Sequence, residues 1–126
     1  MTNKQSAPVY LNLLRIRFPV GAVTSIAHRI SGVLLFIALP AFVYLLGLSL
    51  QSPAGFAEAA SVLQNTGLKF ASAIIAWSLF HHLLSGIRFL LIDIEQGVLI
   101  PAARLTAWLV NIAGLACTGL YLWWIL

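Results

Sequence analysis

The sequence has 126 residues, of which 61% are hydrophobic and only 8% are charged, and its mean hydropathy is +0.99. A soluble domain carries about a quarter of its residues as Asp, Glu, Lys and Arg. This chain cannot cover a water-facing surface with so few charges, and we predict an integral membrane protein in a lipid bilayer. Its net charge of +4 comes from residues that flank apolar segments, which is typical of membrane topology and argues against nucleic-acid binding.

Several cofactor types are excluded within this chain by its residue content. Cys117 is the only cysteine, whereas an iron–sulfur cluster takes about four thiolates and structural zinc sites need several Cys or His ligands at short spacing. The sequence contains neither a glycine-rich phosphate loop nor a dinucleotide fingerprint. We therefore do not expect it to bind ATP, NAD or FAD.

The first part of the chain is polar and then mixed. Residues 9–18 interleave apolar side chains with Arg15 and Arg17, and Pro19 follows. We expect a short interfacial segment that leads into the bilayer. A secretory signal is the competing interpretation, although the apolar run that follows is too long for the hydrophobic region of such a signal.

Three long apolar runs predict transmembrane helices at about residues 22–50, 67–93 and 104–126. The first would reach about 42 Å at 1.5 Å per residue, which exceeds the ~30 Å hydrocarbon core. Its first turns should therefore lie at the inner boundary of the membrane. Pro40 lies inside this run and is a candidate for a kink. The predicted fold is an all-α bundle of three transmembrane helices, forming a single transmembrane domain over residues 1–126.

The two connections between these runs differ in character. Residues 51–66 begin with Ser52-Pro53, a typical helix start, and should form a short surface helix. Residues 95–104 should form a short turn that contains Gly97 and Pro101. The third run has no charge after Arg104 and ends with three aromatic residues that predict an interfacial anchor, namely Tyr121, Trp123 and Trp124.

The distribution of Lys and Arg predicts the orientation in the membrane. One side has only Lys69, whereas the N-terminal side and the second turn have most of the cations, namely Lys4, Arg15, Arg17, Arg29, Arg88 and Arg104. Since cytoplasmic loops carry the excess of Lys and Arg, the N-terminus should face the cytoplasm or the mitochondrial matrix.

The predicted helices contain ionisable side chains that are costly in a membrane. Each costs about 2.5–3.5 kcal/mol at a helix centre, and such residues usually have a function. They are His28, Arg29, His81, His82, Arg88 and Asp93. Antiparallel helices should place Arg29, Arg88 and Asp93 near one level at the inner boundary, with His82 about 9 Å deeper than Arg88.

One face of the second predicted helix has the residues expected of a haem site. His82, Gly86, Phe89 and Asp93 follow the spacing of a single helix face. Gly86 would let a large flat ligand approach the backbone. A histidine in apolar surroundings can ligate haem iron, and the propionates would point outward to Arg and His side chains. The second axial ligand would then come from another chain.

Simpler interpretations of these residues remain open at this point. His82 could merely hydrogen-bond a neighbouring helix, and Arg29 could snorkel to lipid headgroups. Asp93 could pair with Arg88 or end the helix. His81 lies about 100° from His82 around the helix and could be the ligand on geometry alone. Spacing by itself therefore predicts an intramembrane cofactor or ion site.

The first predicted helix has a second set of candidate residues. Ser25, Arg29, Gly32 and Phe36 share a stripe, and His28 lies beside it. A hydroxyl and a guanidinium at a membrane boundary are suitable donors for a quinone carbonyl, because they stabilise the charge that develops on reduction. Serine also packs between membrane helices without any ligand.

Two motifs resemble the signatures of the cytochrome b subunit of succinate dehydrogenase, respiratory complex II. The first is FPVGAVTSIAHRISG at residues 18–32, which has the family's Ser-x-x-His-Arg-x-Ser-Gly run at residues 25–32. The second is His82, followed by Gly-Ile-Arg at residues 86–88 and then Asp93. The resemblance spans residues from about 11 to 95, with both motifs at the expected separation.

This resemblance implies a function and a set of site residues. His82 would be an axial ligand of a haem b shared with a second small membrane anchor subunit. His28, Arg29 and Arg88 would lie near the haem, while Ser25 and Arg29 would line a quinone pocket close to Asp93. The other partners would be an iron–sulfur subunit and a flavoprotein, so the chain would be part of an enzyme complex and no enzyme alone. The expected location is the bacterial inner membrane.

The sequence departs from the family pattern at two positions, and three alternative functions stand against this interpretation. Phe89 stands where many relatives have histidine, and His81 is an additional histidine beside the expected ligand. A haem-free membrane anchor and the anchor of a fumarate reductase are the closest alternatives. A small transporter or channel half is a third, although the charges cluster on one side of the membrane instead of crossing it.

Overall fold

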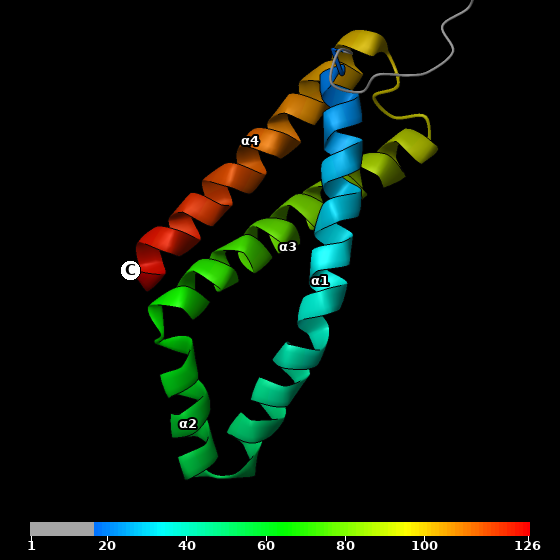
Figure 1. The fold of residues 1–126 in the computed structure, drawn as a ribbon. Helices are drawn as coiled ribbons and strands as arrows, with labels where there is room; N and C mark the ends of the chain where they lie inside the picture. Colours follow the sequence, from blue (N-terminus) through cyan, green and yellow to red (C-terminus); the bar gives the residue numbers. More distant parts are fainter. Residues whose placement is uncertain (1–16) are drawn as a thin grey trace, which may run out of the picture.

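The computed structural model of the chain describes residues 17–126, which form four helices and no strand. The helices are α1 (Val20–Gln51), α2 (Pro53–Leu63), α3 (Thr66–Asp93) and α4 (Ile100–Ile125) (Figure 1). Three of them, α1, α3 and α4, are long and apolar enough to cross a membrane. The all-α fold with three transmembrane helices is thus confirmed. The predicted interfacial segment falls almost wholly on residues 1–16 and lies outside the described residues.

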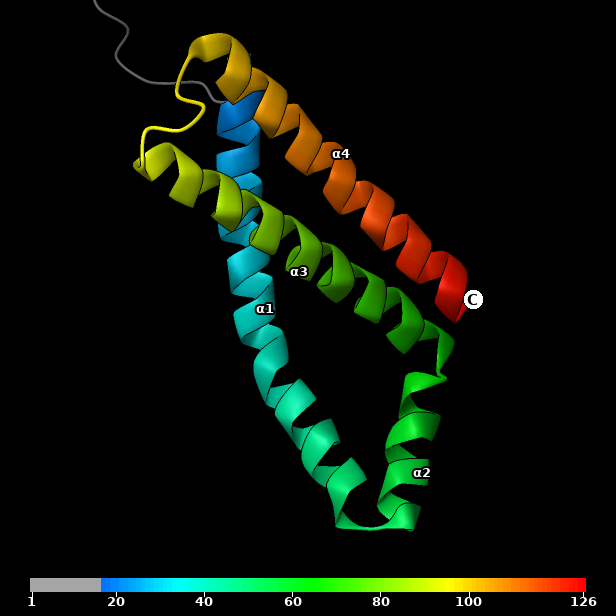
Figure 2. The same cartoon turned by 180° about the vertical axis from the view of Figure 1, so that it is seen from behind.

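The helices pack around α3, which contacts both α1 and α4. α1 and α2 form a V at one end of the molecule, α3 crosses α1 on its way back, and α4 runs antiparallel beside α3 (Figures 1 and 2). The first turns of α1 also contact α4. As a result, α1, α3 and α4 meet at the end of the molecule opposite the V.

Helix α1 is continuous through Pro40. Its lower part, which contains Pro40, runs in a different direction from its first turns (Figure 2). Proline removes one backbone hydrogen bond and its ring crowds the preceding turn, so a change of direction without a break is the expected effect. The kink anticipated at this residue agrees with the bent ribbon.

The short helix α2 begins as predicted from Ser52-Pro53. The Ser52 side chain accepts a hydrogen bond from the backbone N–H of Gly55 at 3.0 Å, and Pro53 occupies the first helical position. Gly55 packs against the backbone carbonyl of Leu48, where an added Cβ would clash. The tight turn between α1 and α2 therefore needs glycine at this position.

The predicted turn at residues 95–104 is too long. The structure begins α4 at Ile100, and Pro101 lies in its first turn. Proline is common in turns, but its missing N–H also costs nothing at the first positions of a helix. The chain reverses within the preceding residues, where Glu95 and Gly97 have positive φ values of 62° and 73°.

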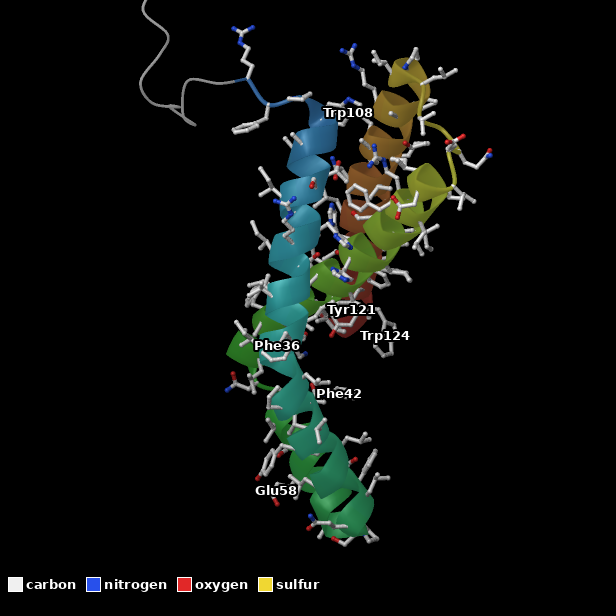
Figure 3. The ribbon with its side chains drawn as sticks, turned by 90° about the vertical axis from the view of Figure 1, so that its right-hand side faces the viewer. Phe36, Phe42, Glu58, Trp108, Tyr121 and Trp124 are labelled. Atoms are coloured by element: carbon white, nitrogen blue, oxygen red, sulfur yellow. The ribbon has the colours of Figure 1, made fainter. Side chains whose placement is uncertain are left out.

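Apolar side chains cover the outside of the molecule, and polar ones lie between the helices. Phe36 and Phe42 on α1, and Trp108 and Trp124 on α4, are exposed (Figure 3). The largest fully buried side chains are instead His81, Thr24, Ser31, Ser78 and Ser85. This reversal of the soluble pattern is expected for membrane helices, where small and polar residues form the interfaces. The chain is a multi-pass membrane protein.

Candidate functional site

Two of the predicted site histidines lie together between α1 and α3. The imidazole rings of His28 and His82 stack with their centroids 4.1 Å apart and their planes 12° from parallel. Phe89 of α3 packs edge-on against the His28 ring, with the two ring centroids 5.2 Å apart. The structure thus joins the conspicuous histidines of both sequence motifs into one aromatic cluster.

The hydrogen bonds of His82 fix which ring nitrogen carries the proton. Its Nδ1 lies 3.1 Å from the backbone carbonyl oxygen of His28 and 3.2 Å from Oγ of Ser31. Ser31 in turn donates to that same carbonyl at 2.8 Å. A carbonyl only accepts, so Nδ1–H of His82 is the donor and Nε2 has the lone pair. Nε2 makes no hydrogen bond within residues 17–126, and the ring is only half-buried.

Two glycines make room for these histidines in a reciprocal way. A Cβ added to Gly32 on α1 would lie 2.9 Å from Cε1 of His82, and one added to Gly86 on α3 would lie 3.7 Å from Nε2 of His28. Gly86 was interpreted as an opening for a flat ligand, but the ring of His28 lies over it. Glycine is the more strictly required at position 32, because a real Cβ atom does not come within 2.9 Å of a neighbouring ring carbon.

The neighbouring His81 has a different environment, in which both ring nitrogens are used. Its side chain is 2% exposed. Nε2 lies 3.0 Å from Oδ1 of Asn111 on α4, and Nδ1 lies 3.3 Å from Oγ of Ser85 one turn further along α3. The ring also packs on Trp77, with the centroids 5.2 Å apart. His81 therefore has no nitrogen left for a ligand.

Arg88 lies against α4. Its Nε donates to Oγ1 of Thr106 at 3.1 Å, and its Nη2 donates to the backbone carbonyl of Ala103 at 3.0 Å. The guanidinium carbon also lies 5.4 Å from the centre of the Phe89 ring, close enough for a cation–π contact. The side chain is 7% exposed, so Arg88 is a buried clamp between α3 and the start of α4.

The remaining predicted site residues are not joined to this cluster by side-chain hydrogen bonds within the described part of the chain. Arg29 and Asp93 are exposed, and Ser25 is half-buried on α1 one turn before Arg29. Asp93 is the last residue of α3. The side chains of Arg29 and Asp93 are thus accessible on the surface of the chain.

Within residues 17–126 no group of three or more His, Cys, Asp and Glu side chains is arranged to hold a metal ion. The described residues instead offer half-buried imidazole nitrogens without hydrogen bonds, namely Nε2 of His82 and the ring nitrogens of His28. That arrangement fits a metal whose other ligands come from a prosthetic group and from another chain.

Sequence reasoning missed the contribution of α4. No site residue was expected on that helix, whereas Asn111 and Thr106 supply partners for His81 and Arg88. The signal was present, because Asn111 is an amide in an otherwise apolar run. The role of Ser31 as a partner of His82 was also missed, although Ser31 belongs to the quoted motif.

The chain is similar to known proteins over most of its length. A family model described as succinate dehydrogenase/fumarate reductase transmembrane subunit matches residues 3–121. A succinate dehydrogenase cytochrome b556 subunit from Coxiella burnetii is 33% identical over 120 residues, covering 92% of this chain and 96% of the relative. Proteins of the same name from Rickettsia felis and Paracoccus denitrificans are 30% and 32% identical, covering 96% and 81% of this chain and 92% and 78% of the relatives.

The match covers nearly the whole chain, including both motifs that contain the stacked histidines. With its three membrane-spanning helices, the protein is a membrane subunit of an enzyme complex and not a catalyst alone. The chain belongs to the transmembrane-subunit family of succinate dehydrogenase and fumarate reductase.

Proposed function

We propose that this chain is the haem b- and quinone-binding anchor of a succinate:quinone oxidoreductase, through which electrons from succinate reach a quinone. The observation that carries the proposal is the hydrogen bond of His82 Nδ1 to the His28 carbonyl, which leaves Nε2 as a lone-pair donor. The names of the relatives, which include cytochrome b556, support the same reading.

His82 is the proposed axial ligand. Histidines that bind metals usually donate their other ring N–H to a carbonyl or carboxylate, which fixes the tautomer and orients the ring. The bond from His82 Nδ1 to the His28 carbonyl has this form. The haem would supply a one-electron redox centre between its protein ligands. Because His81 has both nitrogens engaged, the second axial ligand is assigned to a second small membrane subunit.

Three further residues are proposed to contact the haem edge. His28 stacks on His82, so it lies beside any group bound to that ring. Arg29 is adjacent in sequence and exposed, and it can form a charge-assisted hydrogen bond with a propionate. Arg88 uses Nε and Nη2 for α4, and its remaining nitrogen, Nη1, is assigned a contact with the same carboxylates.

The quinone is assigned to the boundary end of α1. Ser25 and Arg29 are one helical turn apart on the same side of α1, and their side chains make no hydrogen bond to other groups within residues 17–126. A hydroxyl and a guanidinium would hold a quinone carbonyl and stabilise the negative charge that develops on it. Asp93, at the end of α3, is proposed to lie near this pocket.

The proposed partners are a second membrane anchor, an iron–sulfur subunit and a flavoprotein. The proposed location is the bacterial inner membrane with the N-terminus in the cytoplasm, because Lys and Arg are concentrated on that side. The family description also names fumarate reductase, while the relatives cited above are named for succinate dehydrogenase. This supports succinate oxidation as the direction of the reaction.

The test is a dithionite-reduced minus oxidised visible spectrum of the detergent-purified complex, comparing wild type with His82→Ala. We expect a b-type signal in the wild type that is lost in the variant, while succinate oxidation by the soluble subunits survives. Leu83→Ala is the matched control, since Leu83 is the next residue of α3 and is exposed. A normal bis-histidine spectrum in His82→Ala would exclude this ligand, and a wild type without haem would leave a haem-free anchor.

A further inference from the structure

A buried polar cluster joins all three long helices next to the proposed haem ligand. Asn111 of α4 stands at its centre, with Oδ1 3.0 Å from Nε2 of His81 on α3 and 3.2 Å from Oγ1 of Thr24 on α1. Ser85 completes it on the far side of the His81 ring. Thr24 and Ser85 are fully buried. The proposed function leaves this cluster without a role.

Both ring nitrogens of His81 have partners in the cluster. With Oδ1 of Asn111 accepting from His81 Nε2–H, the Ser85 hydroxyl donates to Nδ1. Within the described residues no buried side-chain nitrogen or oxygen lacks a partner. A matched buried network holds one arrangement, because any rotation that breaks it leaves a polar group unpaired in an apolar surrounding.

The backbone of α4 also comes close at this point. A Cβ added to Gly114 would lie 3.4 Å from Cβ of His81. Gly114 and Asn111 are one turn apart on α4, so they contact the His81 ring and its backbone from the same helix. A small residue and a polar residue together are the usual means of fixing a close membrane helix contact.

His81 and His82 are neighbours, so they point about 100° apart around α3. One direction faces α4 and Asn111, and the other faces α1 and His28. An imidazole about 6 Å from the helix axis moves about 2 Å when the helix turns by 20°. Metal and catalytic sites need their groups held within about 0.5 Å. Locking His81 therefore sets the position of His82.

We infer that His81 and Asn111 are positioning residues for the haem, acting through the rotation of α3 and not by contact with the iron. This inference rests on the proposed role of His82. The additional histidine, His81, thus belongs to a polar cluster of three helices that orients the neighbouring His82.

The test uses the assembled complex with Asn111→Leu, which removes the partner of His81 Nε2 at similar size. We expect haem to bind, with a shifted low-spin EPR signal and α-band, and with roughly fivefold faster loss of haem on warming. Thr118→Val is the matched control, because Thr118 is two turns away on α4 and bonds only to the Gly114 carbonyl of its own helix. It should match the wild type in both measurements.

A double variant separates positioning from simple stability. His81→Leu with Asn111→Leu removes both members of this hydrogen-bonded pair, so neither is left unpaired and part of the lost thermal stability should return, although the Ser85 hydroxyl loses its bond to the ring. The EPR signal should stay shifted, since the polar contact between His81 and α4 is then gone. If Asn111→Leu prevents assembly, Ser85→Ala takes its place and should shift the signal in the same direction by less.

Three results would overturn the inference. One is a wild-type EPR signal and haem retention in Asn111→Leu or, if that complex does not assemble, in Ser85→Ala. Another is full recovery of the wild-type signal in the double variant, which would mean a structural role alone. The third is a wild-type complex without haem, which would remove the proposed function as well. A haem that depends on His82 but is indifferent to Asn111 would remove only this inference.

Discussion

The backbone carbonyl of His28 accepts a hydrogen bond from Nδ1 of His82 at 3.1 Å, while the imidazole of His28 stacks on the same ring at 4.1 Å. One residue of α1 thus orients the proposed ligand by two independent contacts. The carbonyl fixes the tautomer, and the stacked ring fixes the plane. Substitutions that disturb either contact should be visible in the haem spectrum before they affect the soluble subunits.

Gly32→Ala should displace His82. The added methyl group would lie 2.9 Å from Cε1 of the ring, and that ring also stacks on His28. We expect loss of most of the haem signal in the reduced-minus-oxidised spectrum. Gly47→Ala is the control on the same helix, because nothing lies within 4 Å of its added Cβ. A fully retained spectrum in Gly32→Ala would mean that α1 and α3 are less closely packed than described.

Ser31→Ala should have a milder effect on the same ring. It removes one of the two partners of His82 Nδ1 and leaves the His28 carbonyl in place. A typical net hydrogen bond contributes about 0.5–1.5 kcal/mol, so we expect faster loss of haem on warming without loss of binding at low temperature. Ser49→Ala is the control, since Ser49 bonds only to the Leu46 carbonyl within its own helix.

The membrane fold could be predicted from the sequence because it depends on the length and hydropathy of whole segments and not on single residues. Three apolar runs are too long and too poor in charge for any soluble alternative, and their lengths agree with the observed α1, α3 and α4 to within a few residues. The start of α4 was placed too late because Pro101 looks the same in a turn and in the first turn of a helix. Only the backbone geometry distinguishes these two positions.

The candidate site residues stand out in the sequence, whereas their contacts with one another do not. The unusual cost of ionisable groups in a membrane singled out His28, His81 and His82. Where each of the last two rings points depends on the rotation of α3, and His81 finds its partner on another helix at Asn111, 30 residues away in the sequence. Periodicity describes one helix at a time, so it could not contain that information.

Arg88→Lys should weaken the attachment of α4 to α3. The guanidinium donates from two nitrogens to Thr106 and to the Ala103 carbonyl, and a single ammonium on a flexible stem does not reproduce that fork. Hydrogen bonds from charged groups contribute about 1.5–3 kcal/mol, so thermal unfolding of the purified complex should occur several degrees lower. Arg104→Lys, at an exposed position early in α4, should unfold with the wild type. Equal midpoints for all three would show that this clamp does not stabilise the bundle.

Substitution of Ser25 and Arg29 should separate quinone reduction from succinate oxidation. Arg29 is exposed and Ser25 is half-buried one turn earlier on α1, so neither substitution disturbs the packing between helices. Loss of one donor to a developing charge costs about 10²–10³ in turnover in favourable cases. Ser25→Ala and Arg29→Gln should therefore reduce the rate with quinone strongly, while the rate with an artificial acceptor that takes electrons from the soluble subunits stays constant.

Val33→Ala is the matched control for this pair, because Val33 is exposed on α1 one turn beyond Arg29. A large effect there would mean that the whole surface of α1 is sensitive, for instance through its contact with the second anchor. Equal loss of both rates in Arg29→Gln would point to failed assembly, and an Arg29→Lys variant then decides. If Lys restores assembly but not quinone reduction, the guanidinium itself is needed at the quinone, since an ammonium keeps the charge and loses only the planar donor pair.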